Sequence, residues 1–89
     1  MTLDEIRKSV AAETTLVSQT FDIVLQGQPA DLTGFDMRVA ELCLATRALP
    51  LEQARGLVPE FERLASALDN LRDYVAAMAK AEANEPAKP

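Results

Sequence analysis

The strongest structural signal in the sequence is the stretch LVPEFERLASALDNLRDYVAAM, residues 57–78. Large apolar side chains recur in it at alternating spacings of four and three residues, the heptad pattern of a helix that packs along one face. We call these residues the seam, and they are Leu57, Phe61, Leu64, Leu68, Leu71, Val75 and Met78. The pattern predicts a long helix near residues 58–82 and an all-α fold class.

Two prolines frame the segment before this helix. Pro50 ends the element before it and can occupy the first turn of the next one, so residues 51–57 are predicted to form a short helical turn. Pro59 lacks a backbone N–H and its ring crowds the preceding turn. It therefore either starts the long helix or kinks it, and the sequence leaves both alternatives open.

A first helix is predicted near residues 3–26. Thr2 and Glu5 have the spacing of a capping box, in which each side chain bonds a backbone N–H of the other residue. Gly27 suits a helix C-terminus, and Pro29 prevents continuation. The apolar stripe of this helix consists of Leu3, Ile6, Val10, Thr14, Val17, Phe21, Val24 and Leu25.

A second helix is predicted near residues 32–49, with Asp31 or Thr33 as its cap and Pro50 as its end. Its stripe consists of Leu32, Phe35, Val39, Leu42, Cys43, Thr46 and Leu49. Because the connector is short, the first two helices should run antiparallel. The expected fold is a small antiparallel three-helix bundle: a single helical domain over residues 1–81, followed by a disordered tail over 82–89.

The charge balance argues against two classes of partner. Among 89 residues, nine are basic and fourteen acidic, for a net charge of −5. Nucleic acids and anionic membranes are bound mainly through lysine and arginine, so neither is expected as a partner. A single cysteine, no apolar run of membrane-spanning length, and an acidic start where a secretory signal would be basic favour a cytoplasmic protein.

Side chains suited to catalysis are scarce. The chain has no histidine, one cysteine and three scattered glycines, which removes the commonest general base and metal ligand and any phosphate-binding loop. We therefore predict that the protein is not an enzyme and has no catalytic, cofactor-binding or metal-binding residues. Cys43 is expected to be an inert core residue. Glu13 borders the first stripe, either as a buried-edge polar group that fixes the register or as a solvated side chain, and we expect it to be solvated.

Apolar residues off the stripes form the candidate partner-binding site. Leu16 and Ile23 stand one heptad apart on the first helix, and Met37 and Leu44 do so on the second. Single exposed apolar residues are ordinary, and the third helix could cover one of these strips. Because such apolar pairs one heptad apart occur on two adjacent helices, a contact with another chain is favoured. We predict that these four residues, with the apolar edge of the third helix, bind a helical segment of a protein partner.

The join between the first two helices carries a further pattern. A leucine and a glycine close the first helix, and a leucine opens the second, which continues with a basic residue and another leucine: Leu25, Gly27, Leu32, Arg38 and Leu42. This arrangement, within residues 16–49, resembles the small export chaperones of the bacterial flagellum, the FlgN-like and FliT-like proteins. The resemblance implies a cytoplasmic chaperone that holds flagellar filament or hook-junction subunits and delivers them to the export apparatus.

A structural or regulatory homo-oligomer is the alternative function. In that case the seam pairs with the same seam of a second copy as a coiled coil, and the protein is a homodimer. The mass in solution distinguishes the two hypotheses, because a client binder is expected to dimerise weakly at most.

Overall fold

The structure, a computed structural model, describes residues 1–84, with side chains described through Ala81. It contains four α-helices over this range: α1 (Leu3–Leu25), α2 (Thr33–Arg47), α3 (Leu51–Gly56) and α4 (Val58–Asn84). No strand occurs within the described residues, so the all-α prediction is confirmed.

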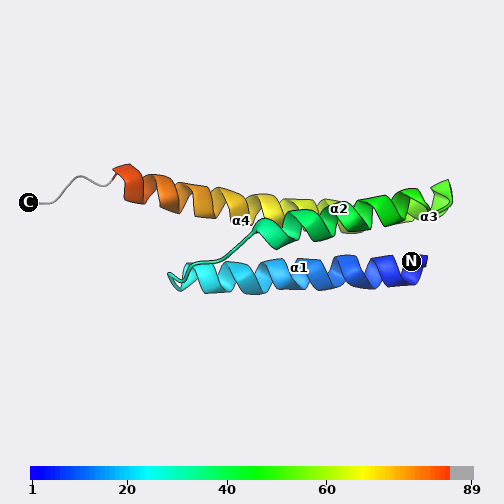
Figure 1. Cartoon of the computed structure of the whole chain (residues 1–89), viewed down its shortest axis with the longest axis horizontal. Helices are drawn as coiled ribbons and strands as arrows, with labels where there is room; N and C mark the ends of the chain where they lie inside the picture. The colour runs from blue at the N-terminus through cyan, green and yellow to red at the C-terminus, as the bar shows by residue number, and fades with distance from the viewer. Residues whose placement is uncertain (85–89) are drawn as a thin grey trace, which may run out of the picture.

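The long helices lie side by side in an elongated molecule of 62 × 18 × 18 Å. Helices α1 and α4 run in the same direction, and α2 runs antiparallel to both (Figure 1). Helix α3 lies at the end of the molecule where the chain turns from α2 into α4 (Figure 1). Because α2 is the shortest of the three, it covers only part of α1 and α4, and the connector spans the other end.

The predicted ends of α1 are confirmed. Thr2 and Glu5 form the capping box: the Thr2 N–H donates to Glu5 Oε1 at 2.8 Å, and the Glu5 N–H donates to Thr2 Oγ1 at 3.2 Å. At the other end Gly27 adopts φ 84°, a left-handed conformation that glycine tolerates best. The N–H groups of Gly27 and Gln28 donate to the carbonyls of Val24 and Ile23, which completes a Schellman motif.

Of the two residues predicted to cap α2, Asp31 makes the capping hydrogen bond. Asp31 Oδ1 accepts a hydrogen bond from the Thr33 N–H at 2.9 Å. Thr33 is the first helical residue rather than the cap, and the residue at the N-cap position is Leu32, whose side chain makes no capping bond. The acidic side chain just outside the helix therefore satisfies one of its free N–H groups.

The segment between α2 and α4 forms a helix of its own, so the count of three helices is corrected to four. The predicted turn is the six-residue helix α3, with Pro50 as its N-cap. Pro59 lies in the first turn of α4, where its missing N–H costs nothing, so it starts this helix and does not kink it. The junction is tight, because Leu57 donates its N–H to Ala54 and accepts one from Phe61.

Helix α4 is longer than expected at its C-terminus. It runs to Asn84, so residues 82–84 of the predicted tail are helical. Three of the residues near this end are alanines, the strongest helix formers, which accounts for the extension. Residues 85–89, the rest of that tail, lie outside the described residues.

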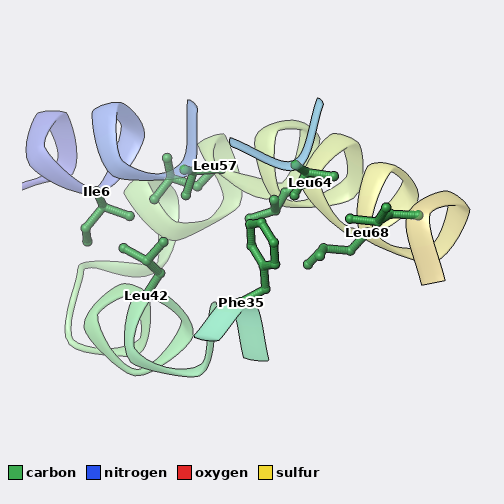
Figure 2. Close-up of a cluster of buried hydrophobic side chains, with 9 residues drawn as sticks. Ile6, Phe35, Leu42, Leu57, Leu64 and Leu68 are labelled. Atoms are coloured by element: carbon green, nitrogen blue, oxygen red, sulfur yellow. The ribbon is translucent and has the colours of Figure 1, made fainter. Parts of the chain in front are cut away.

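Among the residues whose side chains the structure describes, nine apolar residues are buried in the core, all of them from the predicted stripes. Side chains of α1, α2 and α4 point toward one another in it (Figure 2). Its members are Ile6, Val10, Val17, Phe35, Leu42, Leu57, Leu64, Leu68 and Leu71. Three outer members of the stripes, Leu25, Cys43 and Met78, are exposed instead. The seam is thus largely enclosed within its own chain.

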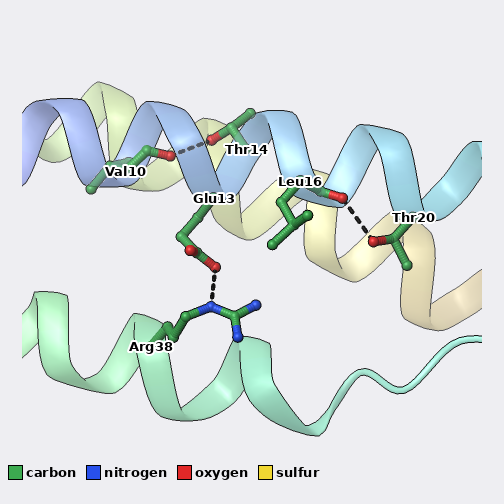
Figure 3. A network of polar contacts seen from close by, with 6 residues as sticks. All are labelled: Val10, Glu13, Thr14, Leu16, Thr20 and Arg38. Atoms are coloured by element: carbon green, nitrogen blue, oxygen red, sulfur yellow. Dashed lines mark hydrogen bonds and ion pairs between the residues drawn. The ribbon is translucent and has the colours of Figure 1, made fainter.

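A salt bridge aligns α1 with α2. Arg38 Nε donates to Glu13 Oε1 at 2.7 Å (Figure 3). The Glu13 side chain is only 13% exposed, so the prediction that it is solvated is wrong. Arg38 also lies over the Phe35 ring at 5.0 Å, which fixes the guanidinium in place. Sequence periodicity placed Glu13 at the edge of a stripe but did not reveal that a cation of α2 would cover it.

Alanine substitution in the seam should destabilise the protein strongly. Leu68→Ala or Leu71→Ala removes a buried side chain and leaves a cavity, at an expected cost of roughly 2–5 kcal/mol. Urea unfolding followed by circular dichroism measures this loss. Leu16→Ala and Ile23→Ala are the controls, with an expected cost below about 1 kcal/mol because these side chains are exposed. Equal losses in both pairs would show that Leu16 and Ile23 belong to the core.

The helix caps make stability depend on pH. Hydrogen bonds from the backbone and side chain of Thr2 hold the pKa of Glu5 below its ordinary value of 4.5, and bonds from Thr33 lower the pKa of Asp31 from 3.8. A depressed pKa stabilises the fold above the ordinary pKa, and this stabilisation is lost as the pH falls through the folded-state value. A chain with Glu5→Gln and Asp31→Asn should therefore lose less stability on acidification below about pH 4.5 than the wild type. Urea unfolding across this range tests it, and identical slopes would contradict it.

Candidate protein-binding site

All four residues predicted to bind a partner are exposed. Leu16 and Ile23 on α1 are 38% and 41% exposed, and Met37 and Leu44 on α2 are 64% and 62% exposed. The difference between the helices has a geometric cause. Met37 and Leu44 each follow a buried residue by two positions, about 200° around the helix, and so face directly away from the core.

The four residues do not gather in one compact strip. The Glu13–Arg38 bond shows which levels of α1 and α2 lie opposite each other. On that register, Leu16 and Met37 lie within roughly 3 Å of the same level, at a rise of 1.5 Å per residue. Ile23 and Leu44 lie roughly 24 Å apart along the axis by the same estimate. Figure 3 shows Leu16 on the side of α1 that faces α2, close to the Glu13–Arg38 pair.

A second apolar feature, a cleft between α2 and α4, was not predicted. Its volume is about 440 Å³. Both helices contribute apolar side chains, and three charged residues are among those that line it. The lining residues are Asp36, Val39, Ala40, Cys43, Phe61, Leu64, Ala65, Leu68, Asp69 and Arg72. We refer to this feature as the α2–α4 cleft.

The α2–α4 cleft exists because small residues face it from both sides. Ala40 and Cys43 on α2 and Ala65 on α4 are too short to fill the space between the helices. The large residues of α2, Phe35 and Leu42, are buried in the core instead. Small residues on both helices were visible in the sequence, but they indicate a cleft only once α2 and α4 are known to be neighbours.

Cys43 is exposed at this cleft, so the prediction that it is a core residue is wrong. It follows the buried Leu42 and lies about 100° around the helix from it, on the flank that faces α4. The apolar period of α2 placed Cys43 at the edge of the stripe. Only the position of α4 determines that this edge remains open.

A further hollow lies at the end of the molecule that α2 does not reach. Its volume is about 360 Å³, and it is formed by the end of α1, the connector and α4. Val24, Pro29, Val75 and Met78 are among its lining residues. Two helices and an extended segment enclose less apolar surface than three helices do, which accounts for the half-buried state of Val75.

Two further features of the described residues concern metal sites and membrane-spanning helices. No group of three or more cysteine or acidic side chains within residues 1–81 is arranged to hold a metal ion. Among the described helices, none has the length and hydrophobicity needed to cross a bilayer.

Comparison with known proteins finds no match to this chain among family models, curated proteins or solved structures. The resemblance to flagellar export chaperones therefore remains a prediction from the sequence pattern.

The exposure of Cys43 predicts its reactivity. A thiol reagent should modify Cys43 in the folded protein without denaturant, at a rate within about tenfold of that in urea, because no opening of the core is required. Thiol titration monitored by absorbance or mass measures this rate. Slow modification that accelerates strongly on unfolding would instead show that α2 and α4 close over the thiol.

Proposed function

We propose that this protein is a non-enzymatic protein-binding module that takes up a helical segment of a partner protein. One observation carries the proposal: among the described residues, nine large hydrophobic side chains are exposed and the core holds nine. Soluble proteins that act alone rarely expose large contiguous apolar patches, and exposed apolar residues on adjacent helices are typical of contact surfaces. The exposed set is Met1, Leu16, Ile23, Leu25, Met37, Leu44, Leu51, Val58 and Met78.

The thin core supports this proposal. In it, α1, α2 and α4 form a three-helix bundle, with α3 as its corner. A domain of this size buries a smaller fraction of its unfolded surface than a larger domain does, and it is marginally stable. A partner helix that binds only the folded form would stabilise it by mass action, which suits a chaperone-like module that is completed by its client.

The proposed contact surface is the α1–α2 side of the molecule, with the exposed edge of α4. Leu16 and Met37 lie at nearly the same level and form its centre. Ile23 and Leu44 extend it toward opposite ends, so an elongated helical partner fits this spacing better than a compact one. The resemblance in residues 16–49 supports one particular client class, the exported subunits of the flagellum, and a cytoplasmic location.

A homodimer is the second candidate. It is favoured by the outer face of α2, where Met37 and Leu44 are the most exposed of the four predicted residues. The seam is a poorer candidate for self-pairing than the sequence suggested, because Leu57, Leu64 and Leu71 are buried in the chain's own core. A coiled coil through the seam would require the bundle to open. A light-scattering mass twice that of the chain would favour the homodimer.

New charge on the α1 contact surface should abolish partner binding. Leu16→Glu with Ile23→Glu places two carboxylates in an interface driven by apolar burial, and capture of the partners that wild-type protein retrieves from a lysate should fall at least tenfold. Capture by wild-type protein should persist at high salt, since apolar contacts are not screened. Retrieved partners are identified by mass spectrometry, and the binding is repeated with purified components.

The matched control adds the same charge elsewhere on α1. Ala11→Glu with Ser18→Glu introduces two carboxylates one heptad apart at exposed positions on the opposite flank of the helix. This variant should retrieve partners normally, and circular dichroism should show unchanged helicity in both variants. Undiminished capture by the Leu16/Ile23 variant would exclude the α1–α2 surface as the binding site.

A further inference from the structure

We propose that the α2–α4 cleft is a docking site for a basic amphipathic helix of a partner protein. This inference rests on the proposed function only in that both involve protein partners, since the cleft lies on a different side of α2 from Leu16 and Ile23. It assigns a second surface to the chain and states the chemistry of its occupant.

The shape of the cleft fits a helix. Its lining residues on α4 extend from Phe61 to Arg72, a length of roughly 17 Å or three helical turns. Val39 and Phe61, which are half-buried, line it, and so do the buried Leu64 and Leu68. An occupant with apolar side chains at spacings of three and four residues would place one side chain per turn against them.

The small residues allow a helix to approach closely. Ala40 and Ala65 are both exposed at the cleft and project little from their helices. Helices pack at axial separations of about 8–10 Å, and the shorter distances require small side chains at the contact. A docked helix would thus occupy a fourth position beside α2 and α4 and would be in contact with both.

The charges around the cleft indicate the sign of the partner. Asp69 lines it, and Glu62 lies one heptad earlier on the same face of α4. Both are exposed, and neither takes part in the salt bridges found among the described residues. Arg72 is a cation at the cleft, and it is already paired with Asp36. Lysine or arginine one heptad apart on a partner helix would meet the two free carboxylates.

A second copy of the chain fits the cleft less well. In a symmetric dimer the same surface meets itself, so the acidic edge of α4 would face an identical acidic edge. The net charge of −5 on each copy adds a general repulsion. A basic helix from another protein has neither disadvantage, so it is the occupant that the charges favour.

The probe for this site is a synthetic peptide of about 12 residues, long enough for three helical turns, with leucines on one helical face and lysines beside them. Bound peptide should protect Cys43 from a thiol reagent at least tenfold. The control chain carries Cys43→Ser and Ser18→Cys, which moves the single thiol to an exposed position on α1, outside the cleft. In that chain the reaction rate should not change when the peptide is added.

Two sets of variants test the shape and the charge of the cleft. Ala40→Leu with Ala65→Leu fills the space and should weaken peptide binding at least tenfold, whereas Ala12→Leu with Ala77→Leu adds the same bulk at exposed positions outside it and should not. Glu62→Lys with Asp69→Lys should weaken binding of the lysine peptide and strengthen binding of a peptide with glutamates in place of lysines. Fluorescence anisotropy measures the affinities, and circular dichroism confirms that each variant is folded.

Several outcomes would overturn the proposal. A scrambled peptide that protects Cys43 equally well would show that helical spacing is irrelevant. If Cys43 became protected without peptide as the protein concentration rises, and the mass in solution doubled, a second copy of the chain would be the occupant. A small apolar dye that protects Cys43 where the peptide does not would identify a small-molecule pocket. The Leu16→Glu, Ile23→Glu variant should still bind the peptide, so failure at the cleft and failure of the α1–α2 surface are separable.

Discussion

Burial of the seam is the interaction on which the rest of this structure depends. Four leucines of the seam contribute nearly half of the core: Leu57, which joins α3 to α4, and Leu64, Leu68 and Leu71 on α4. The remaining core residues of α1 and α2 are buried largely because they pack against these leucines. The hydrophobic contribution of each such side chain is about 1.5–3 kcal/mol. The net stability of a domain is only about 5–15 kcal/mol, so the loss of a few of these side chains would unfold it.

The short length of α2 produces the features that distinguish this surface. It has 15 residues, against 23 in α1 and 27 in α4, and it buries only Phe35 and Leu42. Two anchors on one face hold the helix in place and leave its other faces free. The outer face carries Met37 and Leu44, and the face toward α4 borders the cleft. Both candidate binding surfaces thus follow from a helix that is anchored along a single narrow line.

Local signals in the sequence predicted the helices well and the environment of their edges poorly. The capping box at Thr2, the stop at Gly27 and the period of the seam each depend on residues within one or two turns, and all are confirmed. Glu13 and Cys43 lie at stripe edges, where burial depends on which neighbouring helix is close. A helical period shows that a residue borders the core, but it does not identify the helix beside it. The cleft was missed for the same reason.

Stability and binding oppose each other at the α2–α4 cleft. A leucine in place of Ala40 or Ala65 would add three carbon atoms, worth roughly 2 kcal/mol if fully buried between the helices. Two such changes would therefore raise the free energy of unfolding considerably, because the core of this domain is so thin. The same leucines would occupy the space that a partner helix needs. Small residues at these positions leave the free protein less stable and keep apolar surface open, so a docked helix could supply the burial that the chain itself lacks.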